Sequence, residues 1–122
     1  MPAPDTLKPE RWIADAGEAS VAQLDIPPDA LRERRFEVFC SLSVARAGPG
    51  DEAWHEMHVL VNGLHEWLRR EATHADGRDS LDYSFRRSVP PGQALRVSAT
   101  TELHRARQLG LRITAEEEVE LR

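Results

Sequence analysis

Side chains able to do chemistry are concentrated between residues 54 and 67, in the segment WHEMHVLVNGLHEW. This segment contains three of the five histidines and two of the three tryptophans of the 122-residue chain. Imidazole nitrogens and carboxylate oxygens are common ligands of divalent metals, and tryptophan is a common anchor of protein interfaces. Whether these groups can act together depends on which of them share a face of the element that carries them.

The spacing of the histidines separates two pairings. His55 and His58 are three residues apart, whereas the helical zinc-protease motif places its histidines four apart. On a strand, residues three apart point to opposite faces, so this pair cannot share a metal in a sheet either. In a hairpin, His58 and His65 instead lie diagonally on one face, and Glu56 lies beside them. The pattern predicts a divalent-metal site at His58, His65 and Glu56. The plainer interpretation is a pair of half-exposed or interface histidines without a ligand.

The two tryptophans of this segment also have two interpretations. In the same hairpin register, Trp54 and Trp67 share the face of the histidines, while Met57 and Val59 occupy the opposite face. Aromatic side chains fill cores more often than they form interfaces, so core packing is the plainer interpretation. The alternative is a binding face for a protein partner or a second copy, with Trp54 and Trp67 as its anchors.

Two arginine pairs flank a predicted turn at residues 76–77. If the strands on either side of this turn pair, Arg69 and Arg70 become neighbours of Arg86 and Arg87. Such a cluster is either neutralised by nearby glutamates or binds a small anionic ligand. Under the second interpretation, Arg69 and Arg86 bind the anionic ligand.

Composition and motif searches argue against several other classes of protein. The net charge of −5 argues against a nucleic-acid partner, and the chain has neither a nucleophile elbow nor a phosphate-binding glycine motif. No apolar run approaches the roughly 18 residues that span a bilayer, and no signal peptide is evident, so we expect a cytoplasmic chain with no membrane partner. Cys40, the single cysteine, lies in an apolar alternation, which predicts a buried thiol. We expect no cofactor apart from the divalent metal considered above.

The elements that must position these groups are predicted to be strands. Asn62-Gly63 between apolar runs is a strong hairpin signal, because both residues tolerate the positive φ of a tight turn. Alternating apolar residues predict strands over residues 36–45, 53–61, 81–89, 95–101 and 111–115. Turn signals recur between these strands, and together they predict a mainly β fold, a small antiparallel β-sandwich.

Two segments also fit helices. Asn62 could cap a helix over residues 64–74, and residues 101–109 could form a helix that ends at Gly110. If both were helical, residues 54–119 would follow the βαββαβ order of an α+β, ferredoxin-like split βαβ fold. The sequence leaves this alternative open.

Residues 1–30 carry five of the eight prolines, which disfavour long helices and central strands. We interpret this segment as a Pro-rich N-terminal arm with Trp12 and Ile13 as its apolar anchor, followed by a short helical turn from Pro28 to Arg35. Residues 31–122 then form a single β-rich domain of ordinary size.

From these patterns we expect a non-enzymatic binding or assembly module whose partner is another protein or a second copy of the chain. The first alternative is a small metal-dependent enzyme that uses His58, His65 and Glu56. The second is a domain that binds a small anionic ligand near Arg69 and Arg86.

Overall fold

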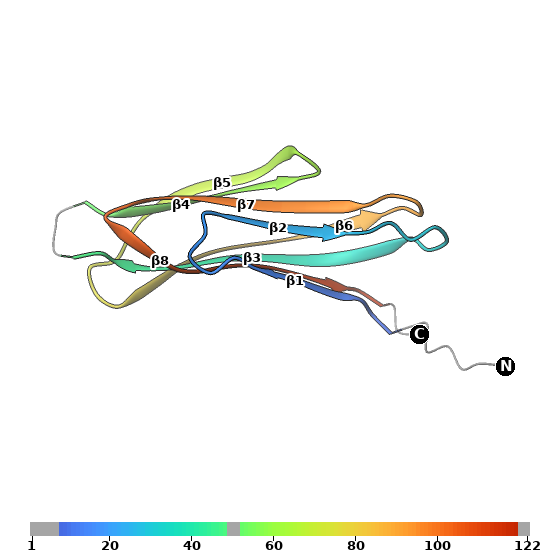
Figure 1. Cartoon of the computed structure of the whole chain (residues 1–122), viewed down its shortest axis with the longest axis horizontal. Coiled ribbons are helices and arrows are strands. Elements are labelled where there is room, and N and C mark those ends of the chain that lie inside the picture. The colour runs from blue at the N-terminus through green and yellow to red at the C-terminus, as the bar shows by residue number, and fades with distance from the viewer. Residues whose placement is uncertain (1–7, 49–51, 120–122) are drawn as a thin grey trace.

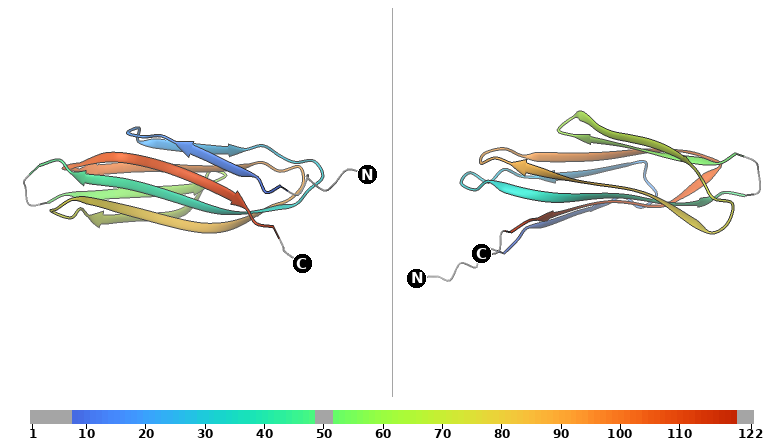
Figure 2. Two further views of the ribbon diagram at one scale, coloured as in Figure 1. Left: turned by 90° about the horizontal axis from the view of Figure 1, so that it is seen from below. Right: turned by 180° about the vertical axis from the view of Figure 1, so that it is seen from behind.

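The computed structural model describes residues 8–48 and 52–119, and over these residues the chain forms strands and no helix. Two four-stranded antiparallel sheets pack face to face (Figure 1), and Figure 2 shows the same two layers from below and from behind. The β-sandwich predicted from the sequence is confirmed, and the ferredoxin-like alternative is wrong.

Each sheet joins strands that are far apart in the chain. In spatial order, the first sheet contains β1 (Arg11–Asp15), β8 (Ala106–Glu117), β3 (Arg34–Arg46) and β6 (Arg78–Val89). The second sheet contains β2 (Val21–Ile26), β7 (Leu95–His104), β4 (Trp54–Val61) and β5 (Leu64–Ala72). β7 therefore lies in the second sheet and β8 in the first, joined at Arg105, whose positive φ of 54° makes the connection tight.

The core lies between the two sheets and follows the alternation of the strands. β3 contributes its even-numbered apolar residues from Phe36 to Val44, all at most 1% exposed. β4 and β7 contribute odd-numbered residues from the facing sheet, such as Met57 and Val97, which are 0% exposed. Burial of such side chains contributes about 1.5–3 kcal/mol each, so the inner faces are the main source of stability.

Two edge strands fall within residues 1–30, the segment predicted to be an N-terminal arm. β1 pairs with β8, and β2 pairs with β7. No proline lies between Pro9 and Pro27, so this part of the segment is free to form strands, and both are edge strands as the flanking prolines require. Residues 1–7 of the predicted arm lie outside the described residues.

The helical turn predicted from Pro28 to Arg35 is wrong. The Asp29 carboxylate instead accepts hydrogen bonds from the backbone N–H groups of Leu31 and Arg32, at 2.9 and 3.0 Å. These bonds form a single turn, and β3 begins at Arg34, so no room is left for a helical turn that reaches Arg35.

The β4–β5 hairpin, which carries most of the candidate site, is confirmed. Asn62 and Gly63 form its two-residue turn with φ values of 51° and 81°. The Asn62 side-chain oxygen also accepts a hydrogen bond from the Arg96 N–H at 2.9 Å, which fixes the turn against β7. The helices considered for residues 64–74 and 101–109 are not formed.

A β-bulge shifts the register of this hairpin. The pairs Val61↔Leu64 and Leu60↔His65 follow directly from the two-residue turn. Counted on from this turn without a bulge, Trp67 would pair with His58, but it pairs with Val59. Glu66 is the extra residue between the two pairs, and it displaces every later residue of β5 by one position. Because strand side chains alternate, the shift moves Trp67 to the other face of the sheet.

Candidate functional site on the outer face of the second sheet

The side chains of the second sheet that point away from the core form its outer face. They alternate along each strand with the buried residues and align in rows across the four strands. We define the outer face by these residues: Val21, Gln23 and Asp25 of β2; Arg96, Ser98, Thr100, Glu102 and His104 of β7; Trp54, Glu56, His58 and Leu60 of β4; and His65, Leu68, Arg70 and Ala72 of β5.

Trp54 is held in a fixed position at one end of this face. Its ring stacks on His104, with centroids 5.8 Å apart, and the Arg70 guanidinium lies 3.6 Å from the Trp54 centroid on its face. Arg70 is itself bonded to Glu56 at 3.1 Å and lies 3.9 Å from Glu102. These contacts place a half-buried indole on the sheet surface in one orientation.

His58 and His65 meet on the same face, as the sequence predicted. The distance from His58 Nε2 to His65 Nδ1 is 3.0 Å, and the ring centroids are 5.1 Å apart. One of the two nitrogens carries the hydrogen of this bond and the other accepts it. His65 precedes the bulge in β5, and His58 lies two residues from Leu60, the β4 residue that pairs with His65. The bulge therefore leaves the diagonal relation of the two histidines as predicted.

The third ligand predicted for a metal does not join this pair. Glu56 is bonded to Arg70, so its carboxylate is already compensated by a cation. Within the described ranges, no three histidine, cysteine or acidic side chains are grouped so that they could hold a metal ion. The structure therefore brings together His58 and His65 of the predicted set.

Trp67 is not on the outer face, which corrects the predicted partnership with Trp54. The bulge turns Trp67 toward the first sheet, where it stacks on Tyr83 with centroids 4.7 Å apart. The Glu66 carboxylate accepts hydrogen bonds from the Tyr83 hydroxyl and from Arg87, both at 2.8 Å. Burial, and then the bond to Glu66, raise the pKa of Tyr83. Trp67 thus closes the side of the sandwich between β5 and β6.

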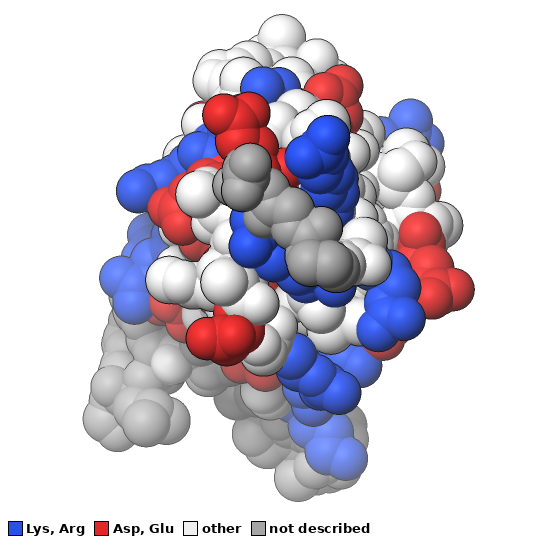
Figure 3. All heavy atoms as spheres, turned by 90° about the vertical axis from the view of Figure 1, so that its left-hand side faces the viewer, with Lys and Arg blue, Asp and Glu red and all other residues white. Residues whose placement is uncertain are grey.

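The predicted basic cluster at Arg69 and Arg86 is not formed. β5 and β6 belong to different sheets and do not pair. Arg69 is bonded to Glu71 at 2.7 Å, and Arg86 is bonded to Glu118 at 3.1 Å on the outer side of the first sheet. Figure 3 shows basic and acidic side chains interspersed at the end of the sandwich where β4 begins, rather than a field of one sign.

His55, which is not among the predicted ligands, has a structural role. It is 0% exposed, and its Nδ1 lies 2.8 Å from the Thr73 hydroxyl. Its Nε2 has no hydrogen-bond partner among the described residues. The signal that could have placed it inside was its parity with Met57 and Val59, because alternate residues of a strand share one face.

Cys40 is buried, as predicted. It is 1% exposed on the inner face of β3. Burial, with a smaller effect of the Glu66 carboxylate, raises the pKa of the Cys40 thiol to about 12. A thiol of this kind is protonated at neutral pH and is a poor nucleophile.

Hollows of the surface lie at the margins of the outer face. One of about 570 Å³ lies beside the hairpin turn and is lined by residues that include Asn62, Leu95 and Arg96. Another of about 420 Å³ lies beyond Trp54 and is lined by residues that include Arg70 and Thr73. Neither hollow is lined by His58, His65, Leu68 or Thr100. No helix long enough to cross a membrane occurs in the described ranges.

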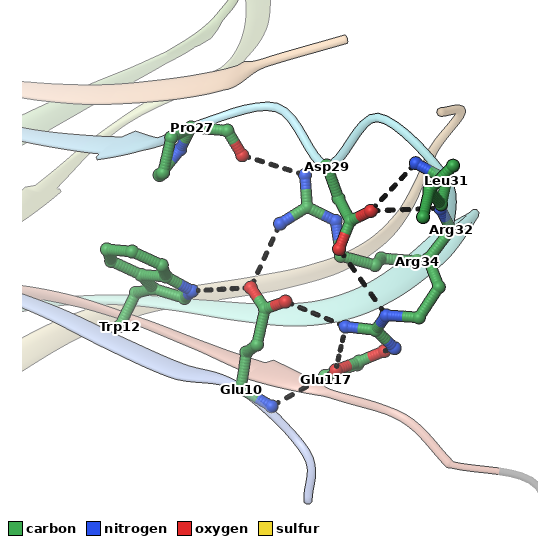
Figure 4. Close-up of polar contacts among 8 residues, drawn as sticks. All are labelled: Glu10, Trp12, Pro27, Asp29, Leu31, Arg32, Arg34 and Glu117. Atoms are coloured by element: carbon green, nitrogen blue, oxygen red, sulfur yellow. Dashed lines mark hydrogen bonds and ion pairs between the residues drawn. The ribbon is translucent and has the colours of Figure 1, made fainter. Parts of the chain in front are cut away.

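A second cluster of charged side chains lies at the end of the sandwich opposite to the start of β4. We call Glu10, Arg32, Arg34 and Glu117 the charged clasp (Figure 4). Arg34 is bonded to Glu10 at 2.9 Å, and Arg32 is bonded to Glu10 and Glu117 at 2.8 and 2.7 Å. The clasp joins the start of β1, the β2–β3 connection and the end of β8.

Burial and hydrogen bonding act in opposite directions on Glu10. Burial alone would raise the pKa of Glu10, but hydrogen bonds from Trp12 and Arg34 and the charges of the two arginines hold it below its ordinary value of 4.5. The carboxylate form of Glu10 is therefore the form that the clasp stabilises.

No protein-family model matches this chain, and no curated protein matches it in sequence. Among solved structures, the chain is similar to part of the dimeric latent PorU from Porphyromonas gingivalis, with a TM-score of 0.53 and 10% sequence identity. The match covers 90% of this chain and 13% of the PorU chain. At this identity the likeness shows the fold alone, and it agrees with a β-sandwich.

Proposed function

We propose that this domain is a non-enzymatic assembly module that associates with a second copy of itself through the outer face of the second sheet. The observation that carries the proposal is the fixed position of Trp54 between His104 and Arg70 on a sheet surface. A large aromatic ring that loses little further freedom on binding is the typical anchor of a protein interface.

The composition of the outer face supports a protein surface as its occupant. The row through its centre consists of Val21, Thr100, His58 and Leu68, and its two aliphatic residues are 53% and 51% exposed. An exposed row of this kind on an open sheet face suits another protein surface better than it suits a small molecule, because small ligands bind in concave sites.

The charges of this face support a second copy rather than a strongly charged partner. Its ionic groups are paired within the face, Glu56 with Arg70 and Asp25 with Arg96 at 2.6 Å. Two copies of this face could meet without repulsion between like charges. A strongly basic or acidic partner would gain little, because the opposite charges of the face are already paired with each other.

The enzyme hypothesis from the sequence finds less support than assembly. It requires a third group that acts with His58 and His65, and Glu56, the predicted one, is bonded to Arg70. The anionic-ligand hypothesis required Arg69 and Arg86 to converge, and each is paired with its own acidic residue.

Sedimentation equilibrium of the full chain over a range of concentrations tests the proposal. We expect a monomer–dimer equilibrium that Trp54→Ala weakens by at least about tenfold, which is about 1.4 kcal/mol of binding free energy. Phe39→Ala is the matched control, because Phe39 is a 40% exposed aromatic on the outer side of the first sheet. A chain that stays monomeric at every concentration, or a dimer that Trp54→Ala leaves unchanged, contradicts the proposal.

A further inference from the structure

The geometry points to a second property of the outer face: His58 and His65 form a two-imidazole site for a divalent transition-metal ion of the zinc, nickel and copper class. This site does not depend on self-association, because both ligands come from one chain. It differs from the three-ligand site predicted from the sequence, since Glu56 takes no part in it.

The distance between the two nitrogens suits a shared metal. His58 Nε2 and His65 Nδ1 are 3.0 Å apart. Two imidazole nitrogens bound at about 2.0–2.1 Å to one ion lie roughly 2.9–3.4 Å apart, depending on whether the angle at the metal is octahedral or tetrahedral. The hydrogen that now joins the two rings lies on the line between the nitrogens, whereas a metal bound to both would lie to one side of this line. Metal binding would therefore remove this hydrogen and turn the two rings toward the ion.

The backbone holds both ligands in register. His58 lies in β4, which pairs with strands on both sides, and His65 lies directly after the tight turn at Asn62 and Gly63. Leu60 pairs with His65 and is two residues from His58, so the two imidazoles are diagonal neighbours on one face. Ligands fixed on paired strands lose little freedom when a metal binds.

The surroundings leave room for the other coordination positions. The His58–His65 contact is exposed to solvent, so water can complete the coordination shell. The nearest positions of the rows are Leu60, Leu68 and Thr100, none of which carries a positive charge. Two neutral nitrogen ligands favour zinc, nickel and copper over calcium and magnesium, which prefer oxygen.

Isothermal titration of the untagged, chelator-treated chain with nickel or zinc chloride tests the site, with ring-proton NMR of the histidines as a second measurement. The titration is done at a concentration where sedimentation shows a monomer, so its result is independent of assembly. We expect one ion per chain, shifts of the His58 and His65 ring signals, and no response to calcium or magnesium. Binding should weaken as the pH falls, because the metal and the proton compete for the same nitrogens.

His58→Gln and His65→Gln should each weaken binding by at least about tenfold. His74→Gln is the matched control, because His74 is an exposed histidine in the loop after β5. Circular dichroism checks that the variants are folded. Absence of binding by the unaltered chain overturns the inference, and so does binding that both variants retain, because the metal would then be held elsewhere.

Discussion

The charged clasp and the outer face of the second sheet both gather polar side chains, but they use them differently. In the clasp, Arg34 has a side chain only 2% exposed, and its contacts with Glu10 and Pro27 are internal to the fold. On the outer face, the His58–His65 contact is exposed, and Trp54 presents a half-buried ring. A cluster of polar side chains therefore does not by itself mark a functional site. What distinguishes the two regions is whether the groups keep capacity to contact something outside the chain.

Removing the Arg34 cation from the clasp should have the largest effect on stability. Arg34→Met should lower the free energy of unfolding by about 3 kcal/mol, because it removes a buried cation and leaves Arg32 as the one remaining partner of Glu10 in the clasp, and because the Pro27 carbonyl loses its Arg34 donor. Urea unfolding followed by tryptophan fluorescence measures the loss. Arg35→Met is the control, since Arg35 is exposed on the same strand and should change stability by less than about 0.5 kcal/mol. If both variants were equally stable, the clasp would not be structural.

The turn at Asn62 and Gly63 should contribute to the stability of the fold, and it also sets the position of His65. Asn62→Ala should cost about 1–2 kcal/mol, because alanine tolerates the positive φ poorly and cannot accept the Arg96 N–H. Thermal unfolding measures this loss. Asn62→Gly keeps the φ and loses only the hydrogen bond, so it should cost less than the alanine variant. Equal losses would show that the backbone conformation of the turn does not matter.

Acid should weaken the clasp by protonating Glu10. The pKa of Glu10 is lower in the folded state than its ordinary value of 4.5, so its contribution is complete above that pH and is lost as the pH falls through the folded-state value. Stability against pH, measured by urea unfolding, should therefore fall more gently below pH 4.5 for Glu10→Gln than for the unaltered chain. Identical slopes would contradict this role of Glu10.

The smallest effect on stability is expected on the outer face. His58→Gln should change the free energy of unfolding by less than about 0.5 kcal/mol, because the histidine contact is exposed and makes one cross-strand pair. The same urea measurements as for Arg34→Met check it. A loss comparable with that of Arg34→Met would place the histidine pair among the structural contacts and remove the contrast between the two regions.

Much of the fold was predictable because its strands alternate clearly. β3 shows five apolar residues at a spacing of two, and Asn62-Gly63 specifies its own turn. β1 and β2 were not predicted because each is short and shows only a brief apolar alternation, and because the prolines near them disfavour strands.

Part of the candidate site was predictable for the same reason. His58 and His65 lie close to the turn, so a register counted from Asn62-Gly63 places them correctly. Trp67 lies beyond the bulge, and nothing in the side chain of Glu66 distinguishes an inserted residue from a paired one. An error of one position exchanges the two faces of a strand, which is why Trp54 and Trp67 were assigned to one surface.

Self-association through the outer face is tested by NMR of backbone and indole N–H signals while the full chain is diluted. If the outer face of the second sheet is the interface, the Trp54 indole, His58, Leu68 and Thr100 should show concentration-dependent shifts. Phe39 and Ile13, on the outer side of the first sheet, should show none. Shifts that gather around Phe39, or spectra that do not change with concentration, would contradict association through this face.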